Sequence, residues 1–280
     1  MTQNPWESSG KPAMQSAPAM PDGKVPLLPP GKETHVKVSA IDALMAVTKE
    51  ENKFKIIGFL ILMIVATNVI PIIPQIVMIG YLLYLVEARI SRPGEAMLEF
   101  NFDYLMKYLG RGVWYFIAHL VLGLILSIPL GILFFVLFFG MALIGAALGE
   151  AGIVVVLASW VLVIVLGMVI SAVTAIFLAP AIFRAGVAGD FKAAFQWSWI
   201  KSFVGNTWKE AIIAWITLMV LSIPLGLLGL LACGVGVLVV GAVMSLASMI
   251  LMGDLYRLHL SRGGEPILME PKVTLAQIAD

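Results

Sequence analysis

Charged residues are scarce in this 280-residue chain, and their absence from long stretches is the strongest signal in the sequence. Only 12% of the residues are charged and 60% are hydrophobic, whereas soluble globular domains carry about 25% charged residues. No charged residue occurs in 56–86, 112–149, 151–183 or 211–253. Each stretch is longer than the roughly 20 apolar residues with which a helix crosses a bilayer core. The sequence therefore excludes a soluble domain and predicts a polytopic membrane protein.

Cysteine is nearly absent, and the single Cys233 excludes an intramolecular disulfide framework. The apolar stretches are continuous rather than alternating, so a transmembrane β-barrel is not expected. A net charge of +1 offers no basic surface for nucleic acid. We therefore predict an all-α protein of a bacterial inner (plasma) membrane, with membrane lipids as partners and no nucleic acid.

The chain begins with a segment that lacks the apolar core of a signal peptide and is rich in Pro, Ser, Ala, Met and Gly. Such a composition cannot bury enough apolar surface to fold by itself. We predict a disordered tail over 1–32 that stays in the cytoplasm. The remaining predicted units are an amphipathic interfacial helix (33–53), a membrane domain (54–262) and a C-terminal tail (263–280).

The interfacial helix is expected because Ser39 and Asp42 have the spacing of a helix N-terminal cap. After them Ile41, Leu44 and Met45 fall on one helical face. Lysines follow immediately before the first uncharged stretch, and lysines near a membrane helix end favour the cytoplasmic side.

The membrane domain contains an internal repeat. Ser127–Gly131 has the sequence Ser-Ile-Pro-Leu-Gly, which recurs unchanged as Ser222–Gly226, at an offset of 95 residues. The same offset superposes Arg89 on Arg184. Because repeats fix the architecture, we predict two copies, at about 54–148 and 149–243.

Prolines are few within the uncharged stretches, and each is predicted to break or bend a membrane helix. The predicted breaks are Pro71, Pro74, Pro129 and Pro224. The first stretch is too long for one straight span, so it is either a kinked, tilted helix or two short arms that return to the side they entered from. In the second case Asn68 and Gln75 lie near the turn, where they would satisfy backbone groups that proline leaves unpaired.

We expect about five or six membrane helices, in a mixed arrangement in which 56–86 and 112–149 bend sharply and 151–183 crosses once. Glu150 is interpreted as a turn between two spans, with a proton-carrying glutamate as the sharper alternative. Gly145 and Gly149 have the small-residue spacing of closely packed helices.

Two segments, 94–111 and 189–206, are predicted to be amphipathic interfacial helices. In the first, charged residues recur every four positions, which is typical of a solvated helix face: Glu95, Glu99, Asp103, Lys107 and Arg111. Tryptophan and arginine near helix ends are typical of headgroup contacts. The predicted lipid or interface anchors are Arg89, Arg184, Trp197, Trp199 and Trp208.

Catalytic and ligand-binding patterns are missing from the sequence. There is no metal-ligand cluster, phosphate loop or nucleophile–base pair, so we predict no cofactor, no metal and no enzyme activity. His119 lies in an apolar stretch and is a candidate for proton handling, although a neutral hydrogen-bond donor is the simpler interpretation. Cys233 is interpreted as a small packing residue.

The segment from Gly80-Tyr81-Leu82-Leu83 through Arg89 and Arg92 to Gly94 and Glu95 carries a family resemblance, together with the amphipathic stretch 100–110. It resembles the bacterial and archaeal multi-pass proteins grouped as domain of unknown function 4013, over roughly 70–260. The resemblance implies a multi-pass membrane location and gives no catalytic or binding residues.

Three functions remain open at this stage, and the one with least support is a membrane enzyme acting on lipid, which would lose turnover on mutation of Asp103 or His119. The first is a non-enzymatic membrane protein that forms a homo-oligomer and organises or encloses lipid. It is favoured by the small-residue faces and by the lack of a polar site common to both repeats. The alternative is a transporter or channel for an unidentified small solute, because broken helices in repeats often build such sites. Its polar candidates are Ser127, Ser222, Asn68 and Gln75.

Overall fold

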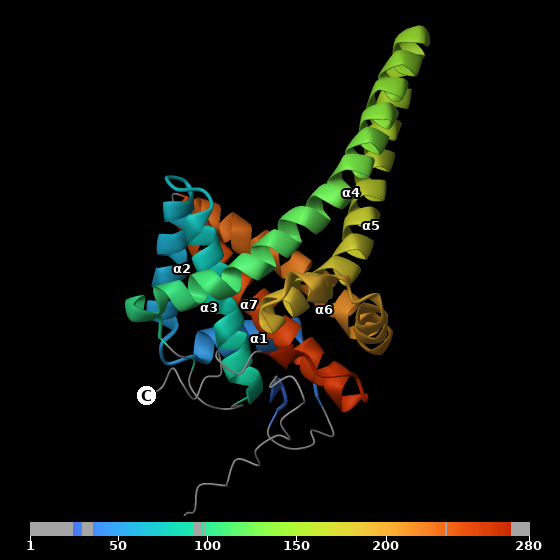
Figure 1. The fold of residues 1–280 in the computed structure, drawn as a ribbon. Coiled ribbons are helices and arrows are strands. Elements are labelled where there is room, and N and C mark those ends of the chain that lie inside the picture. Colours follow the sequence, from blue (N-terminus) through green and yellow to red (C-terminus); the bar gives the residue numbers. More distant parts are fainter. Residues whose placement is uncertain (1–24, 30–35, 92–96, 98, 233, 270–280) are drawn as a thin grey trace, which may run out of the picture.

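The computed structural model describes residues 25–29, 36–91, 97, 99–232 and 234–269, and its long elements are all helices (Figure 1). They are α1 (Ala40–Lys49), α2 (Lys53–Thr67), α3 (Ile73–Ser91), α4 (Leu105–Ala147), α5 (Glu150–Ala188), α6 (Trp197–Leu231) and α7 (Val235–Ser261). The short elements are two 3-10 turns, η1 (Phe102–Tyr104) and η2 (Phe191–Phe195), and a two-stranded antiparallel ladder of β1 (Val25–Pro26) and β2 (Leu268–Met269).

The six long helices form three consecutive hairpins, α2–α3, α4–α5 and α6–α7. The α4–α5 reversal occurs at Gly149 and the α6–α7 reversal at Gly234, which have φ values of 57° and 80°. Both values lie in a region that L side chains rarely adopt, so glycine is needed at these turns. Glu150 is the first residue of α5, directly after the turn that its charge predicted.

The predicted helix breaks are confirmed in the first hairpin. Pro71 lies between α2 and α3, and the chain reverses there. Pro74 is the second residue of α3, where its missing N–H costs nothing because the first turn of a helix has no internal acceptor for it. The sharp bend expected in 56–86 is therefore present.

Neither Pro129 nor Pro224 ends a helix or reverses the chain, because α4 and α6 continue as helices through them. Of the two expectations for these prolines, the break is therefore wrong and a bend within the helix is left. Figure 1 shows α4 curving along its length without reversing. Both prolines are exposed on their helices, so their rings displace no packed neighbour. Ser127 and Ser222, two residues earlier, donate to the carbonyls of Leu124 and Met219 in their own helices.

Glycines bring the helices of the bundle into close contact. A Cβ atom on Gly80 of α3 would overlap the carbonyl of Tyr108, and one on Gly112 of α4 would overlap the carbonyl of Ile76. In the α4–α5 hairpin the same relation joins Gly145 and Gly152, so the close packing expected at Gly145 is present. Small residues permit such backbone contact in membrane helices.

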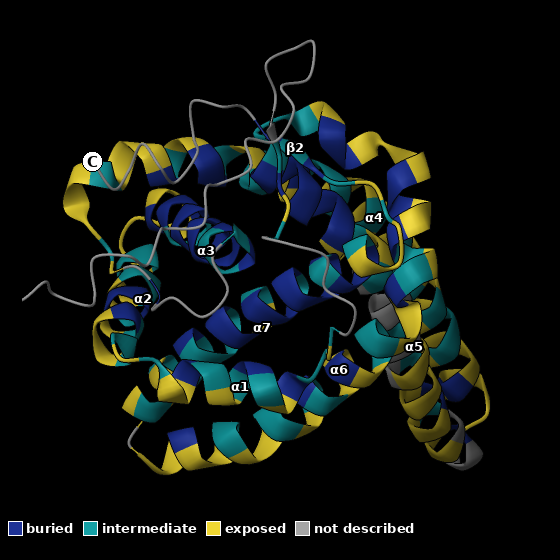
Figure 2. Cartoon of the chain, turned by 90° about the horizontal axis from the view of Figure 1, so that it is seen from below, coloured by how far each residue is buried: buried dark blue, intermediate teal, exposed yellow. Residues whose placement is uncertain are grey.

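The main core is formed by α1, α2, α3, α6 and α7 together with the body ends of α4 and α5, and Figure 2 shows buried residues concentrated on α3 and α7. Its largest fully buried side chains include Trp199, Tyr81 and Tyr256. The distal part of the α4–α5 hairpin projects away from this core (Figure 1) and is largely exposed. The molecule therefore consists of a packed body and a projecting hairpin.

Among the described residues, four helices are long and apolar enough to cross a membrane: α3, α4 together with η1, α6 and α7. The α5 helix adds the shorter apolar segments Gly152–Gly167 and Ile176–Ala188. The prediction of an all-α membrane protein is confirmed.

The predicted amphipathic helices begin later than expected. The helix of the first segment starts at Leu105, after Asn101 caps η1, so the charges from Glu95 to Arg111 do not form one helical stripe. Glu95 lies outside the described residues. The second segment contains Gly189 with φ 67° and η2 before α6 starts at Trp197. In the first segment, a periodic pattern of charges was interpreted as one continuous helix.

The terminal predictions need a correction at both ends. Val25 and Pro26, inside the predicted disordered tail, pair with β2, and Leu27 is buried. Ile267, inside the predicted C-terminal tail, is also buried. The two segments fold because Tyr256 binds both: its hydroxyl donates to the Leu27 carbonyl at 2.8 Å and accepts from the Ile267 N–H at 2.9 Å.

The α1 helix lies inside the predicted interfacial segment and starts where expected. Ser39 caps it by accepting from the Asp42 N–H at 3.3 Å. Small side chains, Ala40 and Ala43, face the body, whereas Ile41 is exposed.

Candidate functional site

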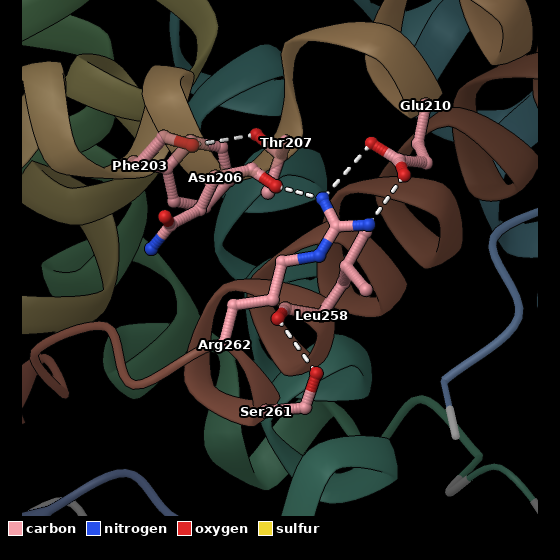
Figure 3. Close-up of polar contacts among 7 residues, drawn as sticks. All are labelled: Phe203, Asn206, Thr207, Glu210, Leu258, Ser261 and Arg262. Carbon is pink, nitrogen blue, oxygen red and sulfur yellow. Dashed lines mark hydrogen bonds and ion pairs between the residues drawn. The ribbon is translucent and has the colours of Figure 1, made fainter. Parts of the chain in front are cut away.

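Polar side chains gather where the C-terminal half of α7 meets the N-terminal half of α6 (Figure 3). Arg262, directly after α7, forms a forked ion pair with Glu210 of α6, with N–O distances of 2.5 and 3.1 Å. The guanidinium also donates to the backbone carbonyl of Asn206. Hydrogen bonding to the Glu210 carboxylate raises the pKa of Arg262 above its ordinary value, so this cation stays charged at any physiological pH.

A buried histidine adjoins this ion pair. The His259 ring is fully buried, and its Nδ1 lies 3.1 Å from the side-chain amide nitrogen of Asn206. An Nδ1 without its proton would accept a hydrogen bond from this amide. The rings of Trp199 and Phe203 lie 5.4 and 5.1 Å from the imidazole and enclose it.

Arg184, at the end of α5, extends the cluster toward the C-terminal segment. Its guanidinium lies over the Trp199 ring at 4.7 Å, a cation–π geometry. The indole N–H of Trp199 in turn donates to the Glu265 carbonyl at 2.8 Å. Arginine, tryptophan and backbone therefore hold α5, α6 and the C-terminal segment together.

A second buried ion pair joins α3 to α4. Glu87 and Arg111 bind through Oε2 and Nη1, and their side chains are 1% and 8% exposed. The crossing at Gly80 and Gly112 brings the two backbones close enough for this contact. Arg111 therefore does not belong to a solvated helix face, as its spacing suggested.

Two of the predicted lipid anchors are wrong. Trp199 is only 1% exposed and Arg184 only 6%, so neither side chain can lie among headgroups. Both occupy the interior because they bind each other. The sequence pattern of an arginine or tryptophan near a helix end is the same for an interior and a surface position.

The other predicted anchors lie at or near the surface. Trp197 and Trp208 are about half exposed, and Lys201 and Lys209 lie over their rings at 5.6 and 5.5 Å. Arg89 is half-buried, and its Nε is buried without a hydrogen-bond partner among the described residues. Their binding to lipid stays a prediction.

The candidate polar residues of the sequence do not meet at one site. His119 is exposed, beside the Tyr115 ring at 6.5 Å. Asp103 is exposed, and Ser127 and Ser222 each bind a carbonyl of their own helix. Cys233 lies outside the described residues. Within the described part of the chain, no group of three or more His, Cys, Asp or Glu side chains could hold a metal ion.

Sequence reasoning missed the residues that build the interior clusters: Glu87, Asn206, Glu210, His259 and Arg262. The sequence feature that could have identified two of them is their place at the ends of uncharged stretches, not a periodic motif. Glu87 and Glu210 are the charges that border uncharged stretches, and a charge at the end of an apolar helix either faces water or pairs inside the bundle. The sequence does not say which partner is near.

Comparison with known proteins gives one family. A family model described as a protein of unknown function (DUF4013) matches residues 61–253. The match covers more than half of the chain and agrees with the resemblance seen in the sequence. No curated protein and no solved structure matches.

Proposed function

We infer that this chain, which belongs to the DUF4013 family, is a non-enzymatic multi-pass membrane protein that forms a homo-oligomer and encloses lipid between its copies. The proposal places it in a bacterial inner membrane with its N-terminal tail in the cytoplasm. The observation that carries the proposal is the projecting α4–α5 hairpin.

The distal hairpin exposes a wide apolar face on each helix. Its large side chains that are 60% exposed or more recur mostly at spacings of three, four or seven residues, with adjacent pairs that widen the face. They are Ile128, Ile132, Phe135, Val136 and Leu143 on α4, and Ile153, Val154, Leu157, Val161 and Leu162 on α5. A surface of this kind is stable only in lipid or against another apolar surface.

The length of the hairpin favours contact with lipid and with the hairpins of other copies. At about 1.5 Å per residue, the 43 residues of α4 extend about 65 Å, roughly twice the hydrocarbon thickness of a bilayer. Only the proximal part packs on the body. Two helices that stand apart from the rest of their own chain leave room beside them, which lipid and the hairpins of other copies would fill.

The polar interior supports a structural role. Several charges near the helix ends are paired within the chain, as in Glu87–Arg111 and Glu210–Arg262. Such pairs fix helix positions but offer no free acid, base or nucleophile in a shared cavity. A transporter or channel remains the alternative, and solute flux that changes at Ser127 or Ser222 would favour it.

Native mass spectrometry of the protein released from detergent micelles tests the proposal. We expect a discrete oligomer that retains lipid. Replacing Phe135 and Leu143 with alanine keeps the hairpin apolar but removes contact area, so this double variant should dissociate at a higher monomer concentration than the wild type. Ile213→Ala, at a residue equally exposed on α6, is the matched control. A strictly monomeric, lipid-free particle would contradict the proposal.

A further inference from the structure

The turn between α2 and α3 exposes an unusual amount of apolar surface. Val69 is 80% exposed, and Ile70, Ile72 and Ile73 are each more than half exposed. No charged residue occurs between Ile56 and Val86. Turns that face water are rich in polar residues, and clusters of exposed branched side chains mark contact with membrane or protein.

Part of the backbone of this turn is hydrogen-bonded within the chain. The N–H groups of Asn68, Val69 and Ile70 donate to carbonyls at the end of α2, over 2.8–3.0 Å. Pro71 and Pro74 have no N–H to satisfy. The side-chain amide of Asn68 donates to the carbonyls of Ile64 and Val65 at 3.0 and 3.4 Å. These contacts lower the cost of placing the turn in hydrocarbon, where each unpaired backbone group costs several kcal/mol.

The base of the hairpin is fixed by polar contacts to the loop that precedes α4. Glu50 accepts from the Met97 N–H at 2.8 Å, and the Asn52 amide donates to the Met97 carbonyl at 3.2 Å. Lys55 pairs with Glu99 at 2.6 Å, with both side chains partly exposed. Charged side chains therefore mark the level at which α2 leaves water.

The arm above this level is short. The 15 residues of α2 extend about 22 Å at 1.5 Å per residue, less than the roughly 30 Å of a bilayer core. Lys53 and Lys55 occupy its first turn, which leaves even less length for the apolar region. The α3 helix is a candidate span by its full length, but its uncharged part, 73–86, has 14 residues and extends only about 21 Å. On the uncharged lengths of both helices, the hairpin reaches the acyl chains but not the opposite surface.

We propose that the tip 67–73 is a re-entrant membrane segment: it inserts among lipid acyl chains from the face that holds Lys55 and Glu99, and it ends inside the bilayer. The α4–α5 hairpin, with its longer helices, differs in being able to cross. This inference rests on the proposed function only for the membrane location, and it does not need an oligomer.

Cysteine labelling in membranes tests the inference. Val69→Cys in a Cys233→Ala background is treated with an impermeant maleimide in spheroplasts and in inverted vesicles. We expect no labelling from either face, and full labelling after detergent solubilisation.

Glu99→Cys, at the base, should react from one face only. A host membrane protein with a cysteine on the far face shows that the reagent reaches it. Ile72→Cys repeats the test should Val69→Cys fail to fold.

A nitroxide on the same cysteine identifies what covers the tip. Among acyl chains it collides with oxygen more often than with a water-soluble nickel complex, and doxyl lipids quench a fluorophore at this position. Labelling of Val69→Cys from the face opposite Glu99→Cys would overturn the inference, because the arm would then cross. Labelling from the same face would also overturn it, as would a disulfide between copies without lipid quenching.

The inference and the proposed function fail separately. If Val69→Cys is protected and the protein is monomeric by native mass spectrometry, the re-entrant tip is supported and the proposed oligomer is contradicted. If Val69→Cys is labelled in an intact oligomer that retains lipid, the proposed oligomer is supported and the re-entrant tip is contradicted.

Discussion

At the residue scale, the Glu87–Arg111 pair carries the largest single constraint. Both charges have left water, which costs several kcal/mol for each ion and is offset only while the partner is present. The pair does not make the crossing of α3 and α4 strong by itself. It makes the observed position of α3 against α4 lower in free energy than a shifted position, in which the two buried charges would be unpaired.

The first prediction concerns this pair. Glu87→Gln leaves Arg111 buried without its counter-ion, and we expect the free energy of unfolding to fall by about 3–5 kcal/mol. The double variant Glu87→Leu/Arg111→Met removes both charges and should recover most of that loss. Unfolding in mixed detergent micelles measures both values.

The matched control is Glu99→Gln, which breaks the exposed pair with Lys55. Exposed ion pairs contribute about 1 kcal/mol or less, so the control should stay close to the wild type. A loss for Glu87→Gln no larger than for Glu99→Gln would contradict the buried role of the pair.

Residue types alone could predict some side-chain positions and not others. Ser39 was identified as a cap because its partner, Asp42, is three residues away. Trp199 and Arg184 could not be placed, because their partners come from other helices and from Glu265. Local interactions are contained in the sequence pattern, whereas an interior contact depends on helix positions that the pattern does not give.

At the scale of elements, close helix crossings depend on glycine. Gly80 and Gly112 let the backbones of α3 and α4 touch, so any side chain there must push the helices apart. Gly131, in the distal part of α4, has no atom within 4 Å of the position its Cβ would occupy. A side chain is therefore excluded at Gly80 and Gly112 but has free space at Gly131.

The second prediction compares these glycines. Gly80→Ala should destabilise the protein by more than about 1–3 kcal/mol, the usual cost of overpacking, because its Cβ meets backbone rather than a movable side chain. Gly131→Ala should be neutral or stabilising by about 0.5–1 kcal/mol, since alanine favours the helix. Thermal melting in the same detergent compares the two, and equal losses would contradict the crossing.

Proline positions show what the sequence could predict about elements. The reversal near Pro71 was predictable because the charge-free stretch is too long for one span and holds two prolines. Pro129 gave the same signal, yet α4 runs through it and reverses at Gly149. A single proline on an exposed helix face costs one hydrogen bond, and a long apolar helix with a neighbour tolerates that loss.

At the scale of the whole molecule, three hairpins divide the chain into a packed body and an apolar projection. The composition was sufficient to predict an all-α membrane protein and its uncharged segments. It was not sufficient to predict that α4 and α5 leave the body, because the same residues would serve a helix buried in the bundle. The projection is also the feature on which the proposed oligomer depends.

A disulfide scan along α4 in native membranes tests that account most directly. Single cysteines from Ile132 to Leu143, in the Cys233→Ala background, are oxidised and the fraction of covalent dimer is measured at each position. If copies pack through their hairpins, the dimer fraction should rise and fall with a period of about 3.6 residues. Its minima would then mark the face toward α5 and the lipid. A uniformly low fraction along the whole segment would mean that the hairpins of different copies do not meet, and would contradict the account.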